Sequence, residues 1–133
     1  MKPIYSVIDM AVVNWQNNWR IVATGGFLGC SIFILDLDGK IIMRDREWYE
    51  IYEFRVTPVK FYEDQKSFLA VVCRLSARFH RSILYVYTPN GKLFYKEIIG
   101  STTGLLAKKV PDSNCETLLV GDEPGMVYEY KPK

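Results

Sequence analysis

The residue types best suited to binding a ligand gather around one short segment. Three arginines and the only histidine occur within residues 74–81. Arginine beside aromatic rings binds phosphates, carboxylates or stacked bases, because its planar guanidinium pairs with anions and stacks on rings. The alternative is a solvated loop whose long side chains cover apolar surface. The candidate ligand-binding residues, including three aromatic residues expected on the same face, are Arg74, Arg78, His80, Arg81, Trp48, Tyr49 and Tyr52.

No segment contains a complete catalytic or metal-binding motif. His80 lacks a local nucleophile and the orienting group that a general base needs. Residues 36–39 (Asp-Leu-Asp-Gly) have the spacing of a calcium loop but only two carboxylates, so a hairpin turn explains them better. Residues 25–29 are glycine-rich, but no Lys-Ser/Thr pair follows to complete a phosphate loop. We therefore expect no catalytic residue, no metal site and no cofactor; an enzyme with its site at a channel mouth stays an alternative.

Composition narrows the class of protein further. The 133 residues suggest one domain, and the 49% of apolar residues suffice for a core. The net charge of +2 argues against a dedicated nucleic-acid coat, and the aromatic content of 14% excludes disorder. Three cysteines are an odd number without a CxxC spacing, which disfavours a disulfide scaffold or a zinc knot. Without a signal-peptide pattern or a long apolar run, we expect a cytoplasmic protein with no membrane partner.

The chain is predicted to be all-β. Short runs rich in β-branched and aromatic residues alternate with turn residues, and helical periodicity is nearly absent. Asp38-Gly39 and Asn90-Gly91 predict tight hairpins with type I′ turns, which need a positive φ at both central residues. The eleven predicted strands are 8–15, 20–24, 32–37, 41–44, 57–62, 68–73, 83–87, 93–99, 105–110, 117–120 and 126–130.

Internal similarity divides these strands into repeats. Residues 32–40 align with 84–92, and residues 85–89 align with 128–132. Each unit contains about 40–50 residues in a four-stranded meander, which is the size of a propeller blade. The strings ILDLDGK and VYTPNGK resemble the third-strand-to-turn signature of FG-GAP and quinoprotein-dehydrogenase-like propeller blades. The Trp-Asp and Gly-His pairs of tryptophan-aspartate repeats are missing, and a generic β-sandwich or open barrel is the alternative.

The third repeat is incomplete, which leads to a prediction about assembly. We expect blade 1 at about 7–46, blade 2 at about 56–100 and blade 3 at about 103–133. The outer strand of blade 3 would be supplied by residues 3–7 of a neighbouring chain. Three blades close a ring poorly, whereas two copies would form a six-bladed propeller as a homodimer. The alternatives are a fragment of a longer propeller or a partner that supplies a second propeller half.

These observations predict a non-enzymatic β-propeller-type binding or scaffold protein that self-associates into a closed ring. The alternative functions are the enzyme mentioned above and a module that binds an anion or nucleic acid through the arginine and aromatic residues. Near-neutral charge weakens the anion-binding alternative.

Overall fold

The strands follow one another along the chain without an intervening helix in the part that the computed structural model describes, residues 7–25, 31–46, 51–75 and 80–133. The all-β prediction is therefore confirmed, and each of the eleven predicted runs contributes a strand. The strands are β1 (Val7–Trp15), β2 (Asn18–Gly25), β3 (Ser31–Leu35), β4 (Ile41–Arg46), β5 (Ile51–Val59), β6 (Phe68–Leu75), β7 (Arg81–Tyr87), β8 (Leu93–Gly100), β9 (Thr102–Lys109), β10 (Glu116–Asp122) and β11 (Val127–Tyr130).

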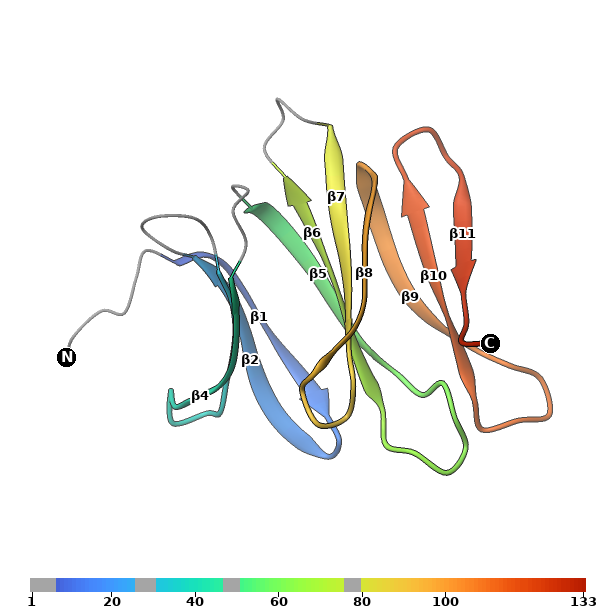
Figure 1. The fold of residues 1–133 in the computed structure, drawn as a ribbon, viewed down its shortest axis with the longest axis horizontal. Coiled ribbons are helices and arrows are strands. Elements are labelled where there is room, and N and C mark those ends of the chain that lie inside the picture. Colours follow the sequence, from blue (N-terminus) through green and yellow to red (C-terminus); the bar gives the residue numbers. More distant parts are fainter. Residues whose placement is uncertain (1–6, 26–30, 47–50, 76–79) are drawn as a thin grey trace.

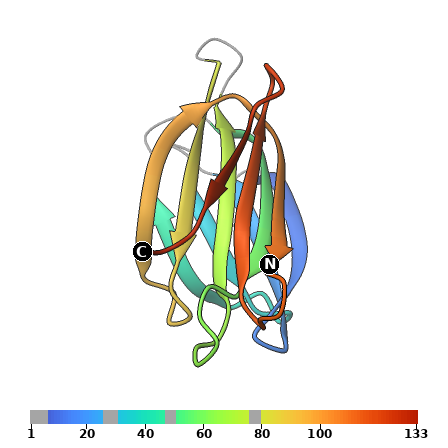
Figure 2. The same ribbon diagram turned by 90° about the vertical axis from the view of Figure 1, so that its right-hand side faces the viewer.

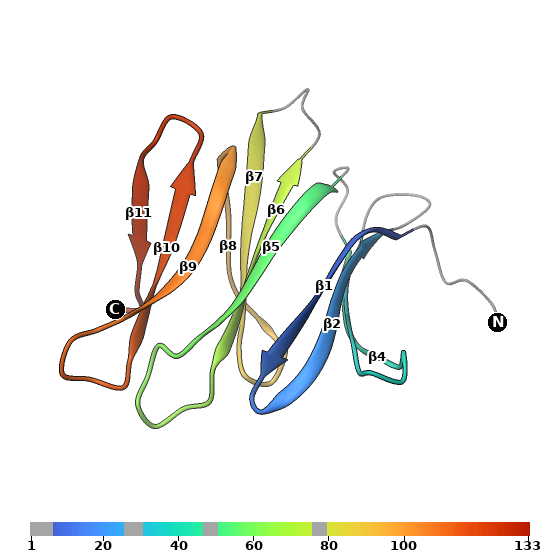
Figure 3. The same cartoon turned by 180° about the vertical axis from the view of Figure 1, so that it is seen from behind.

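The strands form three antiparallel sheets that stand side by side (Figures 1 and 3). Sheet 1 contains β1–β4, sheet 2 contains β5–β8 and sheet 3 contains β9–β11, each in chain order. The three meanders are thus present, two with four strands and one with three. Among the described residues no fourth strand pairs with β11. Residues 3–6 of the predicted donated strand lie outside the described residues, and Val7 belongs to β1, where it pairs with Gly25.

The first strand of sheet 2 differs from its predicted position. It was expected over 57–62 but spans Ile51–Val59. The apolar run continues beyond Val59, but there the backbone leaves sheet 2 and turns to sheet 3. The Lys60 N–H donates to Glu116 Oε1 at 2.9 Å, and the Glu116 N–H donates to the Lys60 carbonyl at 2.6 Å. Phe61 is buried beside this crossing and contributes to the core between sheets 2 and 3.

The hairpin turns form where expected but with another geometry. Gly39 and Gly91 have φ of +86° and +81°, whereas neither Asp38 nor Asn90 has a positive φ. The predicted type I′ turns are therefore wrong. Both loops contain three residues closed by a bond from the glycine N–H to the carbonyl three residues earlier, as in a type I turn followed by a left-handed glycine. The longer loop relieves the strain that a non-glycine residue meets at positive φ.

A type I′ turn occurs instead in the first hairpin. Gln16 and Asn17 form a two-residue loop with φ of +58° and +62°, between the paired residues Trp15 and Asn18. Asparagine tolerates this region because its side chain makes local hydrogen bonds.

The sheets are arranged with their first strands adjacent. β1 contacts β5, and β5 contacts β9. Each of these three strands carries one extra residue near its start, where the register shifts. The shift lies between Val7 and Asp9 in β1, between Ile51 and Glu53 in β5, and between Thr102 and Gly104 in β9. The repeat seen in the sequence is therefore also a repeat in backbone geometry.

Two apolar cores fill the spaces between the sheets. Sheet 1 packs on one face of sheet 2 through Trp15, Ile34 and Tyr85, among others. Sheet 3 packs on the opposite face through Leu118 and Val120. Since β6 and β7 are buried along almost their whole length, sheet 2 is covered on both faces. Sheets 1 and 3 are each covered on one face by sheet 2.

Candidate interaction surface

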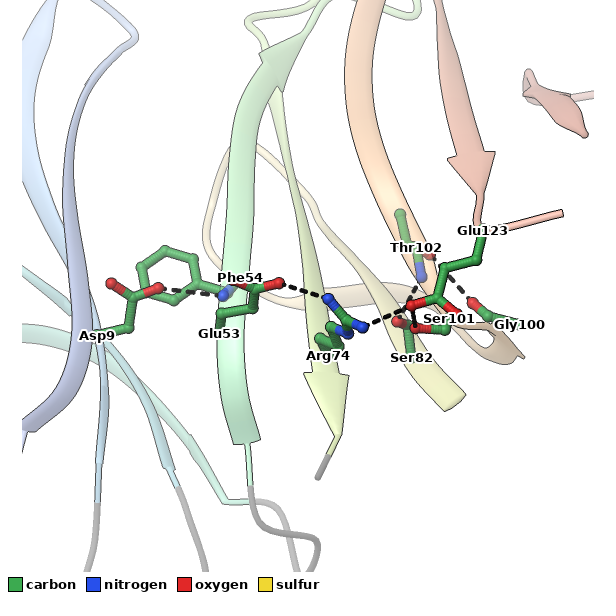
Figure 4. Close-up of polar contacts among 9 residues, drawn as sticks. All are labelled: Asp9, Glu53, Phe54, Arg74, Ser82, Gly100, Ser101, Thr102 and Glu123. Carbon is green, nitrogen blue, oxygen red and sulfur yellow. Dashed lines mark hydrogen bonds and ion pairs between the residues drawn. The ribbon is translucent and has the colours of Figure 1, made fainter. Parts of the chain in front are cut away.

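Arg74, the first of the predicted ligand-binding residues, is already engaged within the protein. Its guanidinium pairs with Glu53 Oε1 at 3.0 Å and with Glu123 Oε1 at 2.5 Å (Figure 4). Ser101 Oγ donates to the same oxygen of Glu123 at 3.0 Å. Two carboxylates thus surround one guanidinium, so the local charge is unfavourable for a bound anion. The cluster links β5, β6 and the β10–β11 turn.

The other predicted binding residues are only partly described. His80 and Arg81 lie at the start of β7 with exposed side chains, and His80 has a φ of +47°. Arg78, Trp48 and Tyr49 lie outside the described residues, as does the side chain of Tyr52. The predicted arginine–aromatic site therefore stays a prediction.

Further polar contacts on this end of the sheets fix the three sheets to one another (Figure 4). The Phe54 N–H in β5 donates to Asp9 Oδ2 in β1 at 3.2 Å. The Thr102 N–H at the start of β9 donates to Ser82 Oγ in β7 at 3.0 Å. At the opposite end, the Trp15 indole donates to the Ser67 carbonyl at 2.8 Å. Hydrogen bonds thus accompany the apolar packing between sheets 1 and 2 and between sheets 2 and 3.

Sheet 3 has one strand fewer than sheets 1 and 2 in the described part of the chain, and the difference lies at its outer edge. Within the described ranges β11 pairs only with β10, and Figure 2 views the molecule from this end. The equivalent third strand of sheet 2, β7, pairs on both sides. Tyr85 in β7 is 1% exposed, whereas its counterpart in the repeat, Tyr128 in β11, is 44% exposed. A strand that is buried in sheet 2 therefore lies on the surface in sheet 3.

A groove of about 440 Å³ runs between the outer strands of sheets 2 and 3, beside this edge. Half of its lining residues within the described ranges are aromatic, and three are charged. Phe94 packs edge-on against Phe68 with ring centroids 5.1 Å apart, and Tyr95 lies 6.1 Å from Tyr130. We call this the aromatic groove; its lining residues are Phe61, Tyr62, Val86, Phe94, Tyr95, Glu129, Tyr130, Lys131, Pro132 and Lys133.

Glu97 lies close to two tyrosines of the groove wall, Tyr95 and Tyr130. The Tyr95 hydroxyl donates to Glu97 Oε2 at 2.7 Å, and this bond, with some burial, raises the pKa of Tyr95. Burial, together with the charge and hydrogen bonding of Glu97, raises the pKa of Tyr130 to about 12. Both phenols therefore keep their protons to a higher pH than a free tyrosine does.

Sheets 1 and 3 also expose apolar side chains on the faces that point away from sheet 2. On sheet 1, Met10, Val12 and Trp19 are exposed, and the strand register places them on one face. On sheet 3, the register places Leu106 opposite Leu119 and Val127 opposite Gly121 on the outer face. Leu106 and Val127 are both exposed. We call these surfaces the outer face of sheet 1 and the outer face of sheet 3.

The end of the molecule with the β1–β2, β5–β6 and β9–β10 loops carries a polar hollow. Its volume is about 430 Å³, and its lining includes Lys60, Lys109 and Asn114. No group of three or more metal-ligating side chains occurs within the described ranges. Nor is any helix in those ranges long and apolar enough to cross a membrane.

No protein-family model matches the chain, and no curated protein sequence matches it. The resemblance to propeller blades therefore stays a prediction.

Sequence reasoning missed the aromatic groove, although a signal for it was present. The alignment of residues 85–89 with 128–132 pairs Tyr85 with Tyr128 and Tyr87 with Tyr130. An aromatic pair that is buried in a four-stranded repeat must be uncovered in a repeat that lacks its outer strand. That inference needed the face on which each tyrosine lies, which depends on the register between β10 and β11.

Proposed function

We propose that this protein is a non-enzymatic binding or scaffold module of the β-propeller type that self-associates into a closed ring. The observation that carries the proposal is the contrast between the sheets. Sheet 2 is buried on both faces, while sheets 1 and 3 each expose apolar side chains on one face. Exposed apolar surface of this kind marks an association site.

The arrangement of the sheets supports a ring of two chains. The three first strands lie next to one another, as the innermost strands of consecutive blades do. The outer faces of sheets 1 and 3 are at opposite ends of the row, so one chain cannot bring them together (Figure 1). A two-fold axis would place the outer face of sheet 1 from one copy against the outer face of sheet 3 from the other. Two identical joints would then complete six blades.

A reducing, cytoplasmic setting belongs to this proposal. Cys73 is fully buried in β6, and Cys115 is partly exposed. A buried thiol of this kind serves packing in a reducing environment.

Complementary variants test which faces meet. Val12→Lys and Leu106→Glu each place a charge on one outer face, and each variant alone is expected to dissociate because both of its joints carry a buried charge. In a mixture, one joint of the mixed dimer is unaltered and the other pairs Lys with Glu. Light scattering should therefore show dimers in the mixture at concentrations at which each variant alone is monomeric.

The matched control is a mixture of Val12→Lys with Val12→Glu. If sheet 1 of one copy meets sheet 3 of the other, every mixed dimer has a charge facing an unaltered apolar sheet at both joints. Mixing should then not restore the dimer. Rescue in this control, without rescue in the first mixture, would show that sheet 1 meets sheet 1 and would contradict the closed ring.

A further inference from the structure

We propose that the aromatic groove receives the residues that directly precede β1, supplied by a second copy of the chain as the fourth strand of sheet 3. This inference rests on the proposed self-association and specifies the segment and the site that take part in it. The occupant would pair with the edge of β11 and place alternate side chains in the groove. Strand addition of this kind gains main-chain hydrogen bonds from the edge and specificity from the pockets.

The shape of the site fits an extended strand. The groove lies directly beside the edge of β11 with which no described strand pairs, between β11 and β8. In sheet 2 the same position next to the third strand is occupied by β8. Tyr128 and Tyr130 share the inner face of sheet 3 with Val120 and Leu118, so an added strand would extend an apolar face that already exists.

The short link between sheets 2 and 3 indicates how the residues before β1 can reach the edge of β11 in another copy. Only Ser101 separates the outer strand β8 from the first strand of the next sheet, β9. An equally short link before β1 would be Ser6, which leaves residues 1–5 (Met-Lys-Pro-Ile-Tyr) for a strand. Five residues extend over about 17 Å at about 3.3 Å per residue. The four residues of β11 would therefore be matched along their whole length.

The direction and composition of the segment also fit. β8 runs antiparallel to β7 and then enters β9, so a strand that enters β1 in the same way runs antiparallel to β11. Pro3 lacks an N–H, which an outer strand tolerates where that position points to solvent. Ile4 and Tyr5 are apolar and aromatic, and because neighbouring side chains of a strand point to opposite faces, one of the two would enter the groove.

The donor must be another copy. β1 belongs to sheet 1 and β11 to sheet 3, and sheet 2 stands between them (Figure 1). In the two-chain ring, the sheet 1 of the partner lies directly against sheet 3, so its preceding residues start next to the groove. The proposal therefore predicts that strand donation and face packing occur at the same joint.

Photo-cross-linking in the full chain tests this inference. Tyr5→p-benzoylphenylalanine places a probe on the donated segment, and Tyr128→p-benzoylphenylalanine places one on the accepting edge. Chains labelled with ¹⁴N and ¹⁵N are mixed, irradiated and digested, and mass spectrometry identifies links between chains of different label. We expect the first probe to link to β8 or β11 of the other copy, and the second to link to residues 1–6. Leu37→p-benzoylphenylalanine, on the exposed β3–β4 turn, is the control and should give neither link.

The outcomes separate this inference from the proposed function. If the mass in solution is that of a dimer but neither probe links residues 1–6 to the groove of the other copy, the strand donation is wrong and the ring can stand. Links from residue 5 to its own chain alone would overturn it in the same way. A monomer at all concentrations would overturn both proposals.

Discussion

Replacing Leu106 with Thr should weaken self-association strongly while leaving the fold intact. Leu106 lies on the outer face of sheet 3, is 60% exposed and would be covered in the ring. Threonine keeps the strand preference of the position but removes most of its apolar surface. The effect should therefore appear in the dissociation constant and not in the stability of the isolated chain.

The magnitude follows from the exposed fraction. Burying a whole Leu side chain contributes about 1.5–3 kcal/mol, and covering the exposed 60% of Leu106 contributes about 1–2 kcal/mol per joint. A two-fold ring has two joints, so the loss is about 2–4 kcal/mol. At 1.4 kcal/mol per tenfold change, the dissociation constant should rise roughly 30- to 700-fold.

Sedimentation equilibrium of the wild-type and variant chains measures this change. The matched control is Leu37→Thr, because Leu37 is 62% exposed but lies on the β3–β4 turn, away from both outer faces. Equal dissociation constants for the wild type, Leu106→Thr and Leu37→Thr would refute the assignment of this face. If circular dichroism showed that Leu106→Thr is unfolded, this would refute the premise that Leu106 contributes to the dimer and not to the stability of the isolated chain.

Three further predictions concern the single chain. Gly39→Ala should lower the free energy of unfolding in urea by about 1–2 kcal/mol, because Gly39 has a φ of +86°, which a residue with a Cβ adopts only under strain. No neighbouring atom lies near the added Cβ, so no clash increases this cost. An unchanged unfolding midpoint would contradict the turn geometry. Trp15→Phe should lower the free energy of unfolding by about 1–3 kcal/mol in the same measurement, because the Ser67 carbonyl loses its indole donor. An unchanged stability would show that this bond does not hold sheet 1 against sheet 2. Tyr130 should ionise near pH 12 in tyrosinate absorbance, and Glu97→Gln should lower this value. Since the unfolded chain loses this proton near pH 10 and the folded chain keeps it, stability should fall as pH rises from about 10 to about 12; a flat profile there would count against the shift.

The strands could be predicted because their signals are local. Runs such as 68–73 and 83–87 combine β-branched and aromatic residues between turn residues, and both became buried strands. Local signals failed where a neighbouring sheet decided the outcome. Lys60 leaves sheet 2 because Glu116, 56 residues away in the sequence, binds its N–H. The Gln16-Asn17 turn shows that asparagine without glycine also suffices for a two-residue hairpin.

The binding residues were harder to predict because their surroundings come from distant parts of the chain. Arg74 has an anion-binding side chain, but Glu53 and Glu123 lie 21 and 49 residues away and pair with it. No local pattern could show that two carboxylates would meet there. The aromatic groove likewise needs β8 and β11 from different sheets, together with an edge of β11 that no strand of the described part covers.

The solution mass of the purified chain tests the central claim most directly. Light scattering over a dilution series should give a stable mass near twice the 15.4 kDa of one chain, because the outer faces of sheets 1 and 3 would cover each other at two joints. A mass of 15.4 kDa at every concentration would contradict the self-closing ring.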